Sequence, residues 1–213
     1  MRYRALAPAV LAALFTAACA DQRSPTGLLP ETVVPSFDLL PYDCSSQSQI
    51  PASECEALRA LFSSTGGPNW TDKTGWLSNS EPCGWFGVEC GGGHVLGLGL
   101  KENHLRGTLP SALGDLVQIG QIHFSGNMLW GPIPPQLGQL GELGYLDLTA
   151  NWLSGSIPPS LGNLTGLSKL QLHWNQLTGE IPPELGNLTE LESLFLGNNK
   201  LTGPVPETLG NLP

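Results

Sequence analysis

The sequence predicts an α/β solenoid in which short parallel strands line a concave face and extended and 3-10 segments form the convex side. Three observations predict this fold over positions 95–213: asparagine recurs every 24 residues, an alternating apolar pair precedes each asparagine, and glycine and proline follow at fixed distances. One such unit cannot bury its own apolar face. Five units must therefore stack on one another, behind a helical N-terminal cap.

The repeating unit reads L-x-x-L-x-L-x-x-N-x-L, which is the leucine-rich repeat pattern. The alternating pair predicts a short strand with one side toward the core. The amide of the asparagine can pair with backbone groups that the following turn leaves without partners. These asparagines are Asn103, Asn127, Asn151, Asn175 and Asn199.

Units such as Leu-Thr-Gly-Glu-Ile-Pro-Pro-Glu-Leu-Gly-Asn-Leu (177–188) resemble the plant-type leucine-rich repeat subfamily. This subfamily forms the ectodomains of plant receptor-like kinases and the polygalacturonase-inhibiting proteins, and similar repeats occur in exported bacterial proteins. The segment Cys83-Gly-Trp-Phe-Gly-Val-Glu-Cys90 matches the C-x-W-x-G-V-x-C motif of the subfamily's N-terminal cap. The sequence differs from the receptor kinases in having no transmembrane or kinase segment, and from the inhibitors in having fewer cap cysteines.

Residues 1–20 predict an export signal, because two arginines precede an apolar stretch that is too short to span a bilayer. Two processing routes stay open. Ordinary cleavage would follow the small-x-small pattern Ala18-Cys19-Ala20, whereas the lipobox-like Thr16-Ala17-Ala18-Cys19 would make Cys19 a lipidated N-terminus. Either route exports the protein, as a secreted or a lipid-anchored envelope protein. Residues 21–50 then form a flexible tether.

Residues 51–94 are predicted to form the cap that covers the open apolar end of the first repeat. Ser53-Glu54-Cys55-Glu56 has the form of a capping box ahead of apolar residues at helical spacing. The helix should end near Gly66-Gly67. Three tryptophans, Trp70, Trp76 and Trp85, supply the bulk of the cap core.

The four cysteines beyond the signal predict two disulfides, because exported proteins fold in oxidising compartments. Four cysteines allow three connectivities, and the spacing does not choose among them. The resemblance to the family's cap implies the pair Cys83–Cys90, which leaves Cys44 with Cys55.

Residues that flank the apolar pair of each strand should project from the concave face in four columns, with neighbours about 4.8 Å apart. The middle repeats place aromatic rings among hydrogen-bonding groups, which suits binding of a protein, peptide or glycan. Trp130 and Trp152 fall just beyond the strands, where they either pack on neighbouring turns or extend the binding face. The candidate ligand-binding residues are Gln121, His123, Tyr145, Asp147, Lys169, Gln171, His173, Trp174 and Phe195.

A catalytic interpretation of the same face is less favoured. Ser125 and His123 are two residues apart on one strand, so their Cα atoms lie about 6.6–7 Å apart with nearly parallel side chains, too far for a nucleophile and its base. A hydrolase or metal site built from His123, Asp147 and His173 is the remaining alternative, but a cross-strand polar pair of His123 with Asp147 explains these residues better. We therefore expect no catalytic residue, no metal and no cofactor.

Charge excludes two classes of partner. The chain has 9 lysines and arginines against 18 acids, a net charge of −9, and no basic run. It therefore lacks the clustered cations of a nucleic-acid or anionic-membrane binder. No segment after the signal has 18 consecutive apolar residues, so membrane contact is expected only through an anchor at Cys19.

These observations predict an exported, non-enzymatic recognition module. The resemblance to the polygalacturonase inhibitors implies an alternative, the inhibition of a secreted glycan-degrading enzyme, and a structural or adhesive surface protein is a further one. The sequence stops where the preceding units continue into another strand. We expect a fragment of a longer array, or else an open end that pairs with a second molecule.

Overall fold

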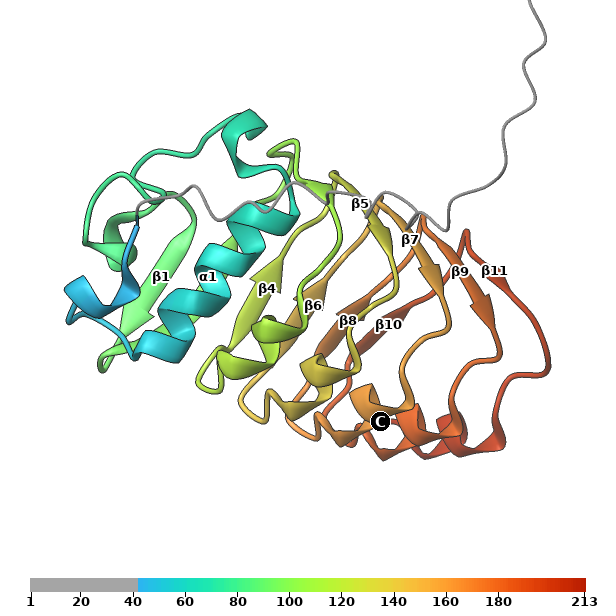
Figure 1. Ribbon diagram of the computed structural model, residues 1–213. Helices are drawn as coiled ribbons and strands as arrows, with labels where there is room; N and C mark the ends of the chain where they lie inside the picture. The colour runs from blue at the N-terminus through green and yellow to red at the C-terminus, as the bar shows by residue number, and fades with distance from the viewer. Residues whose placement is uncertain (1–41) are drawn as a thin grey trace, which may run out of the picture. The chain divides into compact units, whose positions relative to one another are not determined.

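The computed structural model describes residues 42–213, in which a helical cap is followed by a regular stack of repeats (Figure 1). The structure confirms the predicted solenoid, with parallel strands on one side of the stack and 3-10 helices on the other. The signal segment, Cys19 and the tether up to residue 41 lie outside the described residues. Among residues 42–213, no helix has the length and apolar character needed to cross a bilayer.

The concave sheet has six strands in the order β1-β2-β4-β6-β8-β10. β1 and β2 are antiparallel and the remaining neighbours are parallel, in a register that pairs each residue with its equivalent 24 positions on. The middle residue of each central strand, such as Leu146 or Leu170, is fully buried. The strands are β1 (Val88–Gly91), β2 (His94–Gly99), β4 (Gln121–His123), β6 (Tyr145–Asp147), β8 (Lys169–Gln171) and β10 (Ser193–Phe195).

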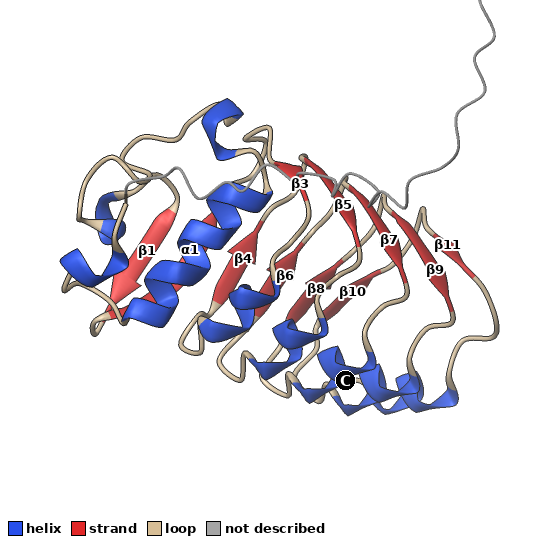
Figure 2. Ribbon diagram, viewed as in Figure 1, coloured by secondary structure: helices blue, strands red, loops and turns tan. Residues whose placement is uncertain are grey.

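A second sheet follows the asparagine turns, in the order β11-β9-β7-β5-β3 (Figure 2). The sequence predicted only an extended segment here. Trp130 and Trp152 lie beyond the concave strands β4 and β6, as predicted, and they belong to this second sheet, where they are Cα partners in β5 and β7. The strands are β3 (Arg106–Gly107), β5 (Met128–Gly131), β7 (Trp152–Gly155), β9 (Gln176–Gly179) and β11 (Lys200–Leu201).

A 3-10 helix closes each repeat, directly after a proline that ends the extended segment. The helices pack so closely that a Cβ added at Gly138 would lie 2.3 Å from the carbonyl oxygen of Ser160 in the next helix. Glycine recurs at this position because no side chain has room there. The helices are η4 (Ser111–Asp115), η5 (Pro135–Gln139), η6 (Pro159–Asn163), η7 (Pro183–Asn187) and η8 (Glu207–Asn211).

The repeating asparagines form a buried ladder, as the sequence predicted. The Oδ1 of Asn151 accepts a hydrogen bond from the backbone N–H of Leu129 in the previous repeat, at 3.0 Å. Its Nδ2 donates to the carbonyl oxygens of Phe124 and Leu148 at 3.0 and 3.1 Å. Each amide thus pairs with backbone groups of its own turn and of its neighbour, which prevents a penalty from unpaired buried groups.

The cap is built on the helix α1 (Ala52–Ser64), whose apolar face buries Leu58, Leu61 and Phe62. The predicted capping box is wrong, because the N-cap is Pro51 and no side chain caps the helix. Glu54 is buried instead, where its carboxylate accepts a hydrogen bond from the Val95 backbone N–H at 2.8 Å. This contact ties the first turn of α1 to the first strand of the stack.

The three cap tryptophans are buried as predicted, and each satisfies its indole N–H. Trp70 donates to the Thr65 carbonyl oxygen at 3.0 Å, Trp76 to the Phe86 carbonyl oxygen at 2.8 Å, and Trp85 to the Asn79 side chain at 3.0 Å. Two short helices, η2 (Gly67–Asn69) and η3 (Pro82–Gly84), complete this part of the cap.

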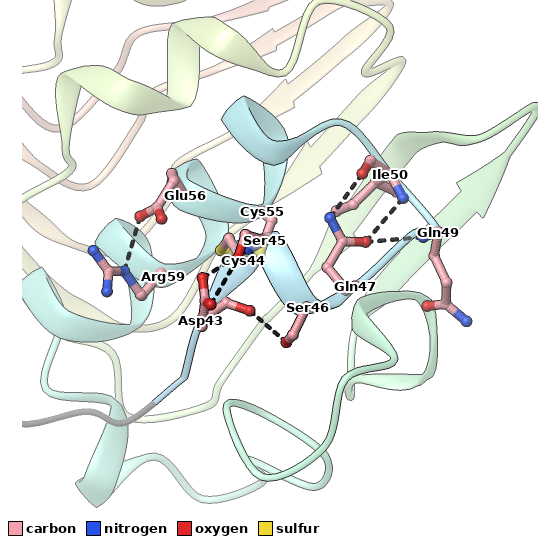
Figure 3. Close-up of a disulfide and its surroundings, with 10 residues drawn as sticks. All are labelled: Asp43, Cys44, Ser45, Ser46, Gln47, Gln49, Ile50, Cys55, Glu56 and Arg59. Atoms are coloured by element: carbon pink, nitrogen blue, oxygen red, sulfur yellow. Dashed lines mark hydrogen bonds and ion pairs between the residues drawn. A yellow bond between two sulfur atoms is a disulfide. The ribbon is translucent and has the colours of Figure 1, made fainter.

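Disulfides join Cys44 to Cys55 and Cys83 to Cys90, the pairing that the family resemblance implied. The first links the short helix η1 (Cys44–Ser46) to α1 (Figure 3). Tyr42, Cys44 and Ile50 are buried in the cap core. The end of the segment predicted as a tether is therefore part of the folded cap.

Candidate functional site

The concave sheet places the predicted residues in straight columns. Gln121, Tyr145 and Lys169 are successive Cα partners at the beginning of their strands. A second column, at the end of the strands, holds His123, Asp147, Gln171 and Phe195 in the same way. Because the register does not slip, side chains from three or four repeats lie side by side on one surface.

Tyr145 contacts one residue of each neighbouring strand, His123 of β4 and Lys169 of β8. The ring of His123 meets it edge-on with centroids 4.4 Å apart, and the Lys169 Nζ lies 5.5 Å from its ring centroid. Partial burial, and to a lesser extent the Asp147 carboxylate, raises the pKa of the Tyr145 phenol above its ordinary value. The phenol is therefore neutral at physiological pH and can donate a hydrogen bond.

A cavity of about 450 Å³ opens beside this column, at the beginning of the strands. Its lining residues include Gln121, Tyr145 and Lys169, together with Glu89 and the exposed Leu96. The residues before the central strands, Gly120, Gly144 and Ser168, also line it. Because these three residues are small, they leave room for the hollow.

The small lining residues of the cavity were not predicted from the sequence. They obey the 24-residue period, one position before the first predicted column. The signal that could have found them is side-chain size, since the column reads Leu96, Gly120, Gly144, Ser168 and Glu192.

The predicted polar pair of His123 with Asp147 is wrong. The two residues are Cα partners, but His123 Nε2 lies 3.2 Å from the Gln121 Oε1. Asp147 is buried and its Oδ1 accepts the backbone N–H of Thr149 at 3.0 Å. The short side chain of Asp147 satisfies its own turn more easily than it reaches across the strand.

The residues of the hydrolase alternative also stay apart. His173 contacts the Thr149 hydroxyl at 3.2 Å through Nδ1, and within residues 42–213 no hydrogen bond joins any two of His123, Asp147 and His173. Ser125 is buried. The described residues contain no group of three or more His, Cys, Asp or Glu side chains that could hold a metal ion.

Trp174 and Phe195 lie at the C-terminal side of the concave columns. Phe195 is exposed, and the His173 ring is tilted against it with centroids 5.6 Å apart. Trp174 follows β8 at the turn that leads into β9, with a left-handed φ of 57°. It therefore stands at the border between the concave sheet and the second sheet.

Two further cavities lie in the cap. One of about 560 Å³ is lined by the loop that contains Asp72 and Trp76, and one of about 480 Å³ lies between Tyr42 and the loop with Asn79. Both are separate from the concave columns, because neither is lined by a residue of the predicted site.

The Leucine Rich Repeat family matches residues 142–164, 166–188 and 190–212. The chain is 31% identical to the BIR2 ectodomain from Arabidopsis thaliana, with a TM-score of 0.67, over 73% of this chain and 84% of that one. It is also 31% identical to a chain of the BIR3–SERK2 complex from Arabidopsis thaliana, with a TM-score of 0.63, over 72% of this chain and 85% of that one.

A third similar structure is the ectodomain of the Arabidopsis thaliana receptor kinase GASSHO1/SCHENGEN3 in complex with CASPARIAN STRIP INTEGRITY FACTOR 2. Its identity is 34% and its TM-score 0.70, over 75% of this chain but only 20% of that one. No curated protein sequence matches the chain.

Proposed function

The chain belongs to the plant-type leucine-rich repeat family, and on this premise we propose that it is an exported recognition module without enzymatic activity. It binds a protein or peptide on its concave sheet. The observation that carries this proposal is the cavity of about 450 Å³ beside Tyr145, where side chains from successive repeats converge. The similar BIR2 and GASSHO1/SCHENGEN3 structures are ectodomains, and two of the three similar structures reported above are complexes with another protein or factor.

The cavity suits a peptide segment that combines one apolar and one acidic side chain. Leu96 offers an exposed apolar surface, and Lys169 supplies a cation. The Glu89 carboxylate also lines the cavity, and its Oε2 accepts a hydrogen bond from the Gln121 Nε2 at 2.7 Å. Tyr145 lies between these groups as a rigid, partly apolar surface of the kind that dominates binding energy at interfaces.

Selection of peptides from a displayed random library on the full chain tests this proposal. Enriched peptides are then titrated against the wild type and against Tyr145→Ala, Lys169→Ala and the convex-side control Gln139→Ala. We expect the two concave variants to bind about tenfold more weakly or worse, since loss of an anchor residue costs more than about 1.4 kcal/mol. The control should bind normally. Peptides that bind all four proteins equally well would place recognition elsewhere.

We also propose that Cys19 anchors the module to the cell envelope as a lipidated N-terminus. The proposal rests on the lipobox-like sequence before Cys19. Mass spectrometry of the mature protein should find an acylated Cys19, and Cys19→Ser should appear in the soluble fraction. An unmodified N-terminus at Asp21 would instead show ordinary signal cleavage.

A further inference from the structure

Three exposed tryptophans, Trp130, Trp152 and Trp174, are spaced 22 residues apart in a chain whose repeat is 24 residues long. The second sheet explains the difference. Its strands pair each residue with the one 22 positions on, as in Trp130 with Trp152 and Ser154 with Gln176. When the register of β7 with β9 is extended by two residues toward the N-terminus, Trp152 and Trp174 become partners.

A backbone hydrogen bond supports this extension, because the Asn151 N–H donates to the Trp174 carbonyl oxygen at 3.2 Å. The three residues therefore follow one another across adjacent repeats, at the strand spacing of about 4.8 Å. We call these three residues the tryptophan row. It runs from β5 across β7 to the turn before β9, on the outside of the stack.

The indole groups of the row are open to a ligand. Trp130, Trp152 and Trp174 are 42%, 50% and 61% exposed. Within residues 42–213 none of their ring N–H groups has a hydrogen-bond partner, whereas all three cap tryptophans have one. Each ring of the row thus presents an apolar surface and a free donor.

The strands of the row carry uncharged side chains beside it, and a cation lies in each edge strand of the sheet. Ser154, Gln176 and Thr178 on β7 and β9 offer hydroxyl and amide groups. Arg106 of β3 and Lys200 of β11 are Cα partners of Met128 and Thr178, and the Lys200 Nζ donates to the Gln176 Oε1 at 3.2 Å. A row of exposed rings along a sheet suits an extended ligand.

One member of the row is held in a costly conformation. Trp174 has a φ of 57°, in the left-handed region that a bulky residue rarely adopts. Glu102, Gly126, Ala150 and Asn198 occupy the equivalent position in the other repeats, and only glycine and asparagine tolerate this backbone readily. The turn therefore imposes the conformation in every repeat, and only Trp174 brings an aromatic ring to this position.

We propose that the tryptophan row is a binding site for a neutral polysaccharide chain. Sugar rings have flat C–H faces that pack on indole rings, and their hydroxyls pair with the free indole N–H groups and with the neighbouring neutral side chains. The three rings themselves carry no charge, and the cations Arg106 and Lys200 lie only in the edge strands β3 and β11, so polygalacturonate is the comparison that separates a neutral chain from an acidic one. An anionic membrane is disfavoured by the net charge of −9 and the absence of a basic run. The site is separate from the peptide cavity of the proposed function.

Two binding experiments on the full chain test the proposal: sedimentation with insoluble cellulose and chitin, and titration with soluble laminarin. Polygalacturonate serves as the acidic comparison. The variants are Trp130→Ala, Trp152→Ala, Trp174→Ala and the double variant W130A/W152A. Gln139→Ala on the convex side and Tyr145→Ala on the concave sheet are the controls. Thermal unfolding of each variant establishes that it is folded.

We expect at least one neutral polysaccharide to bind, each single tryptophan variant to bind about tenfold more weakly, and the double variant to lose binding. The control variants should bind the polysaccharide as the wild type does. Because Tyr145→Ala tests the peptide cavity separately, failure of the peptide proposal would not affect this result. No retention of any neutral polysaccharide, or equal binding by the double variant, overturns the proposal. Preferential binding to polygalacturonate also overturns it, because the row would then bind an acidic polymer. A wild-type dimer that dissociates in the double variant overturns it as well, because the row would then bind a second copy of the chain.

Discussion

At the scale of single residues, the turn after each concave strand imposes a left-handed backbone on whatever residue stands there. Glu102, Gly126, Ala150, Trp174 and Asn198 all have φ between 51° and 68°. Their shared conformation directs the chain inward, so that the following asparagine reaches the backbone groups of the previous repeat. Residues other than glycine and asparagine therefore store strain at this position.

Trp174→Asn should stabilise the protein, because asparagine adopts the left-handed region more readily than tryptophan and the exposed indole contributes little burial. We expect a gain of about 1 kcal/mol in the free energy of unfolding, measured by urea denaturation. Ala150→Asn, at the equivalent position with a φ of 53°, is the control and should gain a similar amount. A loss of stability in Trp174→Asn alone would mean that the indole packs on its neighbours after all.

The positions of the concave residues were predictable, but their contacts were not. Strict periodicity fixes the column of each residue, so Tyr145, Lys169 and Phe195 lie where the pattern places them. Periodicity does not say whether Asp147 reaches across to His123 or bends back to the Thr149 N–H. That outcome depends on side-chain length and on local turn geometry, which a repeat pattern does not encode.

At the scale of secondary-structure elements, the second sheet shows why part of the fold escaped prediction. β3 and β11 have two residues each and the other strands four. Strands this short carry no alternation that distinguishes them from an extended loop. The register of 22 residues differs from the repeat period of 24 and is visible only once the units are stacked. The tryptophan row depends on that register.

The junction between α1 and the stack gives a prediction at the same scale. Glu54→Ala removes the acceptor of the buried Val95 N–H and the 2.6 Å contact with His94 Nδ1. We expect it to lower the free energy of unfolding by about 2–3 kcal/mol, since a buried donor is left unpaired. Ser53→Ala should change stability by less than about 0.5 kcal/mol, because Ser53 is an exposed helix residue and not the N-cap.

Urea denaturation of both variants distinguishes the two interpretations of the helix start. If Ser53→Ala lowers the free energy of unfolding by about 1 kcal/mol, Ser53 caps the helix as the sequence predicted. A neutral Glu54→Ala would show that the junction tolerates water at the Val95 amide.

In the molecule as a whole, over residues 42–213, each repeat contacts only its neighbours. The free energy of local opening is therefore expected to vary along the stack. The cap is cross-linked by two disulfides and filled by aromatic rings that pack edge-on or tilted against one another. The leucines of the central repeats are fully buried between two neighbours, whereas Leu194, Leu196 and Leu201 in the fifth repeat are only partly buried. Less apolar area is removed from water there, and local opening costs less.

Amide hydrogen exchange measures this gradient through two equivalent bonds. The N–H of Phe124 donates to the Asp147 carbonyl oxygen at 2.8 Å, and the N–H of Leu172 donates to the Phe195 carbonyl oxygen at the same distance. The bonds have equal length and the same place in the repeat, so a difference in exchange reports their position in the stack. We expect the Leu172 amide to exchange through an opening of lower free energy than the Phe124 amide, because the fifth repeat can separate from the fourth without disturbing the cap. Equal opening free energies for the two amides would contradict this, since they would require the repeats and the cap to unfold as one cooperative unit.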